Sequence, residues 1–334
     1  MSGAAADGGR FRAALTTRHR LRPVELLPLA AFLLVPVLAP AYLALATQVL
    51  IAVIFAIAID LCVGYAGIVT LGHAVYFGLG AYTAGILSVR GMGQPLLGLL
   101  AGAAVAGVAA AAIGGIILRT SRFTLLILSL GAVFLAREVA NAARGLTGGM
   151  DGLPGIVTPP LFGWFEFDLY GHTGFGYAFG VVAVIFVAVR WLVHTPLGQT
   201  MAAVRDNPDR AAAIGIPVLP RLVLMHALSG AIAGIGGALQ TEISQFVGLN
   251  AMGFELSANG LVMLALGGAG RLYGAFIGPA VFLVAQDRLS HIGPAMMPLW
   301  IGTMVIIVAL FVPGGLLGLL DMRGRWKRGA ERTR

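Results

Sequence analysis

The sequence predicts an all-α fold, a polytopic membrane helix bundle with about ten transmembrane spans, from three observations. Hydrophobic residues make up 58% of the 334-residue chain and charged residues only 11%. This is too little charge to cover a soluble domain of that length. The apolar residues gather in stretches of ~20 residues, the length that a helix needs to cross the hydrocarbon layer. The arginines gather on one side of these stretches, which places the N- and C-termini in the cytoplasm.

The apolar stretches follow one another with short or polar connections. Their approximate bounds are 25–45, 47–63, 68–89, 95–118, 123–140, 175–193, 222–239, 256–266, 273–284 and a stretch within 297–320. The first contains Pro28, Pro36 and Pro40, which a membrane helix tolerates when neighbours satisfy the freed carbonyls. Residues 24–46 are too long for the apolar core of a cleaved signal peptide, so we expect a retained anchor. The eighth and ninth stretches are short and rich in glycine.

Counting basic residues sets the orientation and divides the chain. Cytoplasmic positions include Arg119, Arg122, Arg205, Arg210, Arg221, Arg271 and six basic residues of the C-terminal tail, against Arg90, Arg137, Arg144 and Arg288 outside. We therefore expect a basic cytoplasmic tail at 1–24, a transmembrane domain at 25–320 and a second basic tail at 321–334. Within that domain, residues 141–174 form an external loop and residues 194–221 a cytoplasmic loop.

Several function classes are excluded by composition. The net charge of +8 comes from loops and tails without an aromatic-basic patch, so we expect no nucleic-acid partner. The one cysteine, Cys62, lies in an apolar stretch and is interpreted as an inert buried thiol. No ligand spacing for a metal, no cofactor motif and no nucleophile–base–acid set is present. The only lysine is Lys327 and there is no phosphate-binding loop, so the chain is not itself an ATPase.

Small residues are concentrated in two ways. In the fourth stretch they recur every four residues from Gly98 to Gly114, which predicts close helix packing. Residues 64–83 combine five glycines with polar side chains, and they supply candidates for a translocation path or a helix crossing: Gly67, Thr70, Gly72, His73, Tyr76, Gly80, Tyr82 and Thr83. This density is explained either by a broken or re-entrant helix facing a pathway or by small-residue packing alone. Both interpretations stay open.

Two polar residues in this region have more than one interpretation. His73 is expected to make a structural hydrogen bond between helices or to line a pore, and a metal role is disfavoured. Asp60 is either buried or reaches the membrane interface. A second glycine cluster at 264–279 suggests, as a hypothesis, an inverted repeat that relates the second-to-fifth and seventh-to-tenth spans.

The cytoplasmic stretch 195–217 predicts a short helix at 208–214. Asp206 or Asn207 would cap it, Pro208 would take its first position, and Gly215 would end it. Its alanine-rich face is either a docking surface for a partner protein or part of a folded loop.

These motifs together resemble the M-type of the two permease subunits of branched-chain amino-acid ABC importers. The resemblance covers nearly the whole chain beyond Leu45. It rests on 71–73 with 80–82, 147–155, 198–215 centred on Arg205-Asp206-Asn207, Ser229 with 233–234 and 237–238, the glycines at 267, 268, 270 and 274, and 313–315. Ile68 and Thr70 stand where the family usually has Gln and Ser, which leaves the substrate open. Gln199 stands where Arg is common, and His226 where an aromatic residue is usual.

The resemblance implies a mechanism and a set of partners. The chain would pair with a second permease subunit in a bacterial inner membrane, receive an amino acid from a periplasmic binding protein, and use ATP hydrolysed by two cytoplasmic ATPases. The ATPase-coupling residues would be Arg205, Asp206, Asn207, Asp209, Arg210, Ala212 and Gly215. The alternatives are a related ABC permease for urea, short amides or a sugar, and an ion-driven secondary transporter. The latter usually has paired carboxylates at mid-membrane, which these spans lack.

Overall fold

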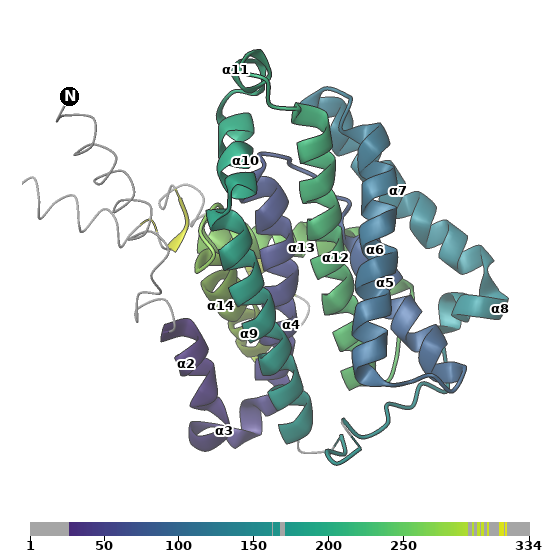
Figure 1. Ribbon diagram of the computed structural model, residues 1–334. Coiled ribbons are helices and arrows are strands. Elements are labelled where there is room, and N and C mark those ends of the chain that lie inside the picture. The colour runs from purple at the N-terminus through teal and green to yellow at the C-terminus, as the bar shows by residue number, and fades with distance from the viewer. Residues whose placement is uncertain are drawn as a thin grey trace, which may run out of the picture.

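The computed structural model describes residues 27–161, 163–167 and 171–292, and isolated residues between 296 and 318. Figure 1 shows that the described chain is a bundle of helices. The described part has no extended strand, only isolated bridges between Leu153 and Val247 and between Leu161 and Phe165. The main helices are α4 (Leu43–Asp60), α5 (His73–Val89), α6 (Pro95–Ile117), α7 (Arg122–Ala142), α9 (His172–His194), α10 (Pro196–Asp206), α11 (Pro208–Ala213), α12 (Val218–Ser244), α13 (Phe254–Gly267) and α14 (Gly274–Ile292).

Five helical segments in the described residues are long and apolar enough to cross a membrane. They are Pro40–Tyr65, Pro95–Ile117, Arg122–Ala142, His172–His194 and Val218–Ser244. The predicted spans at 95–118, 123–140 and 175–193 agree with α6, α7 and α9 within a few residues. The seventh predicted span was too short, because α12 extends beyond 222–239 at both ends. The ten-span count and the inverted repeat remain predictions, and most of the tenth stretch lies outside the described residues.

The first predicted span is not one continuous helix in the residues described from 27 onward. The chain instead forms α2 (Leu27–Leu33), α3 (Val35–Leu38) and the short 3₁₀ turn η2 (Pro40–Tyr42). Pro36 and Pro40 each lie in the first two positions of one of these short elements. Proline has no N–H to donate and its ring clashes with the preceding turn, so each proline favours a new helix start over continuation. Consequently α4 begins at Leu43, earlier than expected.

The centre of the bundle is the contact of α12 with α5 and α6. A side chain at Gly80 of α5 would overlap the backbone of Gly234 of α12, and one at Gly237 would overlap the backbone of Phe77. On α6, the predicted row of small residues is buried, with Ala106 and Ala110 0% exposed. The prediction that this row packs tightly is confirmed, since small residues let helix backbones approach closely.

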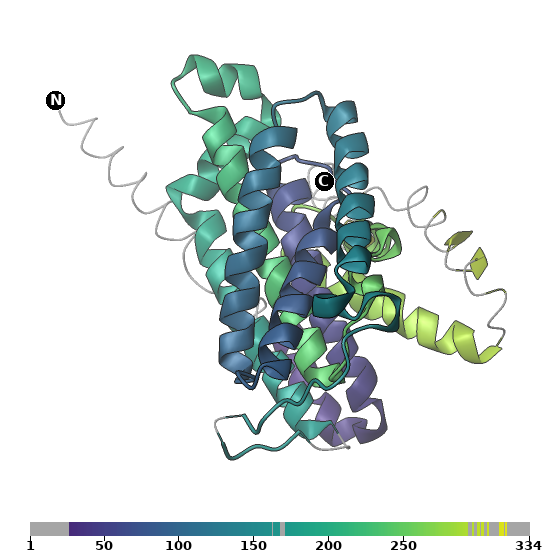
Figure 2. The same ribbon diagram turned by 90° about the vertical axis from the view of Figure 1, so that its right-hand side faces the viewer.

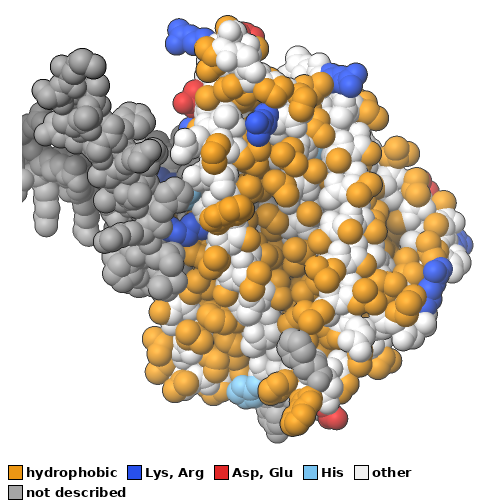
Figure 3. All heavy atoms as spheres, viewed as in Figure 1, with side chains coloured by type: hydrophobic (Ala, Val, Ile, Leu, Met, Phe, Trp, Pro, Cys, Tyr) orange, Lys and Arg blue, Asp and Glu red, His pale blue; other side chains and the backbone are white. Residues whose placement is uncertain are grey.

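Two ends of the bundle are distinct. In Figures 1 and 2, α10 and α11 project from one end, and the segment after α8 (Arg144–Thr147) runs across the other. Figure 3 shows hydrophobic side chains covering the face formed by α6, α9 and α12. Helix α13, with only 14 residues, crosses the bundle obliquely, as Figure 2 shows where it is seen nearly end-on.

Candidate functional site

The first glycine-rich cluster forms an ordered break between α4 and α5. Beyond Asp60 the chain makes one π-helical turn, η3 (Leu61–Tyr65), and residues 66–72 are not helical. Gly67 has a φ of 70°, a left-handed conformation that favours glycine. The Ser129 hydroxyl accepts a hydrogen bond from the Leu71 N–H at 3.1 Å, and the Thr70 hydroxyl accepts one from the Gly72 N–H at 2.9 Å. The helix is therefore broken, and side chains satisfy backbone groups that the break frees.

The break contacts helix α10 and the second glycine cluster at one place, which we call the Arg205 junction (Asp60, Gly64, Arg205, Gly270). The Arg205 guanidinium of α10 donates a hydrogen bond to the Gly64 carbonyl at 2.6 Å. The Gly270 N–H donates one to the Asp60 carboxylate, also at 2.6 Å. A side chain at Gly64 would collide with both Asp60 and the Gly270 backbone. Asp60 is 0% exposed, which settles the question that the sequence left open.

The short helix predicted at 208–214 is present as α11. The Asn207 side chain accepts a hydrogen bond from the Arg210 N–H at 2.9 Å, so Asn207 rather than Asp206 is the cap. Pro208 takes the first position, and Gly215 has a φ of 87° just past the end. The helix ends at Ala213, one residue earlier than predicted. Its local signals were enough to predict it.

The surface of α11 is mostly exposed and partly apolar. Ala211 is buried against the bundle, whereas Ala212 and Gly215 are exposed and Ile214 is 76% exposed. Asp209 and Arg210 are exposed beside them. Asp206 forms an exposed pair with Arg205 at 3.3 Å, which contributes little to stability. Ala212 and Ile214 therefore form a small exposed apolar surface, flanked by charged side chains, at one end of the bundle.

A buried polar network joins α5 to α12. His73 Nε2 lies 2.8 Å from the Ser229 hydroxyl, which donates its proton to the Ala58 carbonyl, so His73 is the donor to Ser229. One turn along, the Tyr76 hydroxyl lies 2.8 Å from His226 Nε2. Both histidines are 0% exposed. Of the two roles considered for His73, the hydrogen bond between helices is the one that the structure contains.

His226 has a second neighbour, because Cys62 Sγ lies 3.4 Å from its Nδ1. The thiol is 0% exposed, as expected for a buried cysteine. No group of three or more metal-ligating side chains was found among the described residues.

The remaining candidates of the first cluster lie toward the other end of α5. Gly80 is at the crossing with Gly234. Thr83 donates a hydrogen bond to the Leu79 carbonyl within its own helix at 2.6 Å. Tyr82 is 4% exposed and packs with Leu153 and Val247, which belong to the loop structure at that end. Its role in translocation is untested.

The predicted external motif at 147–155 is a compact turn. The Thr147 hydroxyl donates to the Ala140 carbonyl at 2.6 Å. Gly148 and Gly152 have φ values of 76° and 77°, and a side chain at Gly148 would overlap the Gly152 carbonyl. The Leu153 N–H donates to the Val247 carbonyl at 2.9 Å. The motif therefore packs onto the segment that follows α12.

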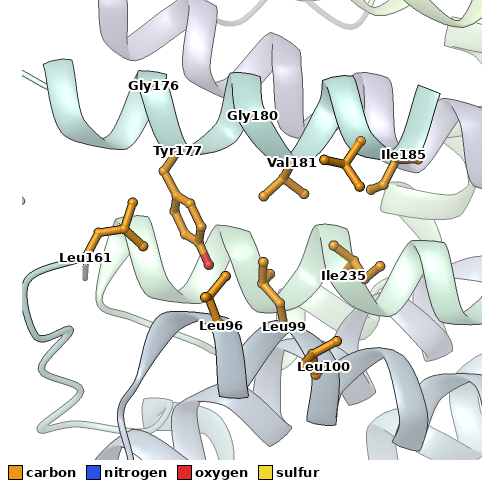
Figure 4. Close-up of a pocket in the computed structure, with 11 residues that line it drawn as sticks. Leu96, Leu99, Leu100, Leu161, Gly176, Tyr177, Gly180, Val181, Ile185 and Ile235 are labelled. Atoms are coloured by element: carbon orange, nitrogen blue, oxygen red, sulfur yellow. The ribbon is translucent and has the colours of Figure 1, made fainter. Parts of the chain in front are cut away.

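Cavities among the described residues lie elsewhere, and none of the eight path candidates lines the following two. The first is an apolar groove of about 540 Å³ between α6, α9 and α12, lined among others by Leu99, Tyr177 and Ile235. In Figure 4, the Tyr177 hydroxyl points toward α12. It donates to the Glu242 carboxylate at 2.8 Å. Leu100, at the groove's edge, is 71% exposed, so the groove opens on the outer surface of the bundle.

The second cavity, of about 260 Å³, lies between α4, α5, α12, α13 and α14 and is lined by the amides of Gln48, Gln240, Asn259 and Gln286. These residues were not among the candidates predicted from the sequence. A signal was present for Gln48, an uncharged polar side chain in the largely apolar helix α4, whereas Gln240, Asn259 and Gln286 lie in helices that also contain charged residues. No motif joined them, because they come from four separate helices.

The bundle with several membrane-length apolar helices defines a multi-pass membrane protein. The chain belongs to the family described as branched-chain amino acid transport system / permease component, which matches residues 41–313. The family resemblance inferred from the motifs is thereby confirmed.

The names of individual relatives describe different transported substrates. The chain is 27% identical over 318 residues to LivM, the high-affinity branched-chain amino acid transport system permease protein of Escherichia coli (strain K12), covering 86% of this chain and 72% of LivM. It is 29% identical over 318 residues to LsrC, the autoinducer 2 import system permease protein of Enterobacter sp. (strain 638), covering 91% and 86%. It is 30% identical over 129 residues to MglC, the galactose/methyl galactoside import permease protein of Salmonella typhimurium, covering 36% and 37%. No solved structure matches the chain.

Proposed function

We propose that this chain is the M-type permease subunit of an ABC importer that moves branched-chain amino acids into the cytoplasm. The observation that carries the proposal is the position of α10 and α11. They form an exposed element at one end of the bundle, and Arg205 joins that element to the break after α4. Family membership and the long match to LivM support the amino-acid substrate.

In this proposal α11 receives a movement from an ATPase and Arg205 carries it into the bundle. A helix of six residues is too short to be stable alone, so it depends on packing. Ala211 supplies one packed side, and Ala212 and Ile214 are free to enter a groove on a partner. Because Arg205 donates to Gly64 and Gly270 donates to Asp60, a displacement of α10 acts on both glycine clusters.

The proposed assembly contains a second permease subunit, two cytoplasmic ATPases and a periplasmic binding protein, in a bacterial inner membrane and without metal or cofactor. Reporter fusions test its orientation. A fusion after Gly149 should give a periplasmic signal and a fusion after Asn207 a cytoplasmic one, because the arginines lie on the Asn207 side. A cytoplasmic signal at Gly149 contradicts the orientation.

The activity is tested in proteoliposomes that contain the permease pair and the ATPases, with binding protein outside and ATP inside. We expect uptake of radiolabelled leucine that stops without ATP. Galactose is the alternative substrate to compare with leucine, because a relative is described as a galactose permease. ATP-dependent uptake of galactose but not leucine would retain the importer and reject the amino acid. Leucine uptake driven by an ion gradient without ATP would reject the importer.

A further inference from the structure

The amide-lined cavity lies beside the segment Pro40–Tyr65, which is long and apolar enough to cross a membrane. Gln48 is eight residues beyond Pro40, the start of the span Pro40–Tyr65, which places it about 12 Å into that span at the helical rise per residue. Asn259 is deeper, because its neighbour Gly260 packs against Phe55 and Ile59. Phe55 lies near the middle of the same span.

The amides of the cavity are available for a ligand. None of the side chains of Gln48, Gln240, Asn259 and Gln286 makes a hydrogen bond to another described residue. Gln48 and Asn259 are exposed and the other two are partly exposed. An amide that faces hydrocarbon without a hydrogen-bond partner costs several kcal/mol. Four amides without a hydrogen-bond partner among the described residues, from four helices at one cavity, therefore call for a polar occupant.

The chemistry of the lining indicates what kind of occupant fits. No charged side chain lines the cavity. Each amide has both an N–H donor pair and a carbonyl acceptor, so together they can accept from an ammonium group and donate to a carboxylate. Phe55 and Phe77 add apolar surface to the same lining. A site without fixed charge also releases its ligand readily, as a transport path requires.

We propose that this cavity is a transient binding site on the translocation path for a small solute of no net charge, with polar groups at one end and an aliphatic part at the other. A zwitterionic aliphatic amino acid has this chemistry. The inference deepens the proposed function and rests on it for the choice of leucine as the probe. It assigns to Gln48 and Asn259 direct contact with the solute.

The first test measures access from water. Cys62, the only cysteine, is 0% exposed, so Asn259→Cys introduces one accessible thiol. We expect a charged methanethiosulfonate reagent, applied to both sides of proteoliposomes while the complex hydrolyses ATP, to modify Asn259→Cys. Leu135→Cys, at a 67% exposed position on α7, should react only with a lipid-soluble maleimide. If Asn259→Cys reacts only with the maleimide or with neither reagent, the cavity faces lipid or protein and the inference is wrong.

The second test measures transport. Asn259→Leu and Gln48→Leu remove the amides at similar size, and each should lower leucine uptake about tenfold, as expected for a lost hydrogen bond to a polar solute. Gln94→Leu, an exposed amide at the start of α6 outside the cavity, is the matched control and should keep wild-type uptake. Wild-type leucine uptake in both cavity variants overturns the inference and leaves the proposed function intact. If the wild-type complex moves galactose instead, the same variants are assayed with galactose, so an error about the substrate is separated from an error about the cavity.

Discussion

Glycine serves opposite purposes at the α5–α12 crossing and at the Arg205 junction. At the crossing, Gly80 and Gly234 bring two backbones together, and a side chain at Gly80 has no space. At the junction, Gly64 makes room for the Asp60 carboxylate as well as for the Gly270 backbone, and hydrogen bonds from Arg205 and to Asp60 hold these groups together. Packed backbones have no alternative arrangement at low cost, whereas a hydrogen bond can be exchanged for another. We infer that the crossing holds the bundle together and that the junction is where it can change.

The largest effect is expected from Gly80→Leu. The new side chain would overlap the Gly234 backbone, and a clash of its Cβ with backbone atoms cannot be relieved by a rotamer change. We expect little folded protein in the membrane by size-exclusion chromatography and no uptake. Gly131→Leu in α7 is the control, because nothing lies within 4 Å of a side chain there. Equal amounts of folded protein for both variants would show that the crossing is not tightly packed.

Arg205→Ala should separate assembly from activity. It removes the donor to the Gly64 carbonyl and a charge close to Asp60, at a cost of about 1–3 kcal/mol. We expect the protein to insert and to bind the ATPases, but uptake to fall at least about tenfold, the change that 1.4 kcal/mol produces. Arg221→Ala, predicted to lie on the same side of the membrane, is the control. Normal uptake by Arg205→Ala would remove the junction from the coupling mechanism.

Ala212→Glu tests the contact between α11 and the ATPase, which precedes the role of Arg205 in the proposed coupling. Its exposed position places the new charge on the proposed docking surface without disturbing the bundle. The expected result is normal insertion, loss of co-purification with the ATPases and loss of ATP-driven uptake. Ala212→Ser keeps the size and adds no charge, so it should remain active. Unchanged ATPase association and uptake in both Ala212→Glu and Gly215→Trp would favour a gradient-driven carrier.

The smallest effect is expected from His226→Phe. The substitution leaves the buried Tyr76 hydroxyl without its partner at 2.8 Å, which costs about 1–3 kcal/mol. Tyr76→Phe combined with His226→Phe should recover part of that loss, because neither polar group is then left unpaired. The measurement is the thermal midpoint of the purified complex for both single variants and the double variant. Additive losses would show that the two side chains are not coupled.

The elements whose ends are set by residues close in sequence were predictable from the sequence. The cap at Asn207, the proline at 208 and the glycine at 215 all act within one short segment, so α11 was located within one residue. The row of small residues in α6 and the ends of α7 and α9 were equally local. The first span shows the limit of reasoning from hydropathy. Pro36 and Pro40 divide it into short helices, and the mean hydropathy of the stretch does not register these breaks.

Tertiary structure alone decided which surfaces meet. In a membrane bundle, the side of a helix that faces lipid is as apolar as the side that faces another helix, so periodicity does not reveal the partner. The Gly270–Asp60 hydrogen bond joins residues 210 positions apart, and the amides at Gln48 and Asn259 meet from separate helices. The sequence by itself determined that the chain is an apolar helical protein with a capped loop helix. The fold decided that Arg205 reaches Gly64 and that the polar cavity lies beside α13 rather than along the first glycine cluster, because only packing brings such distant residues together.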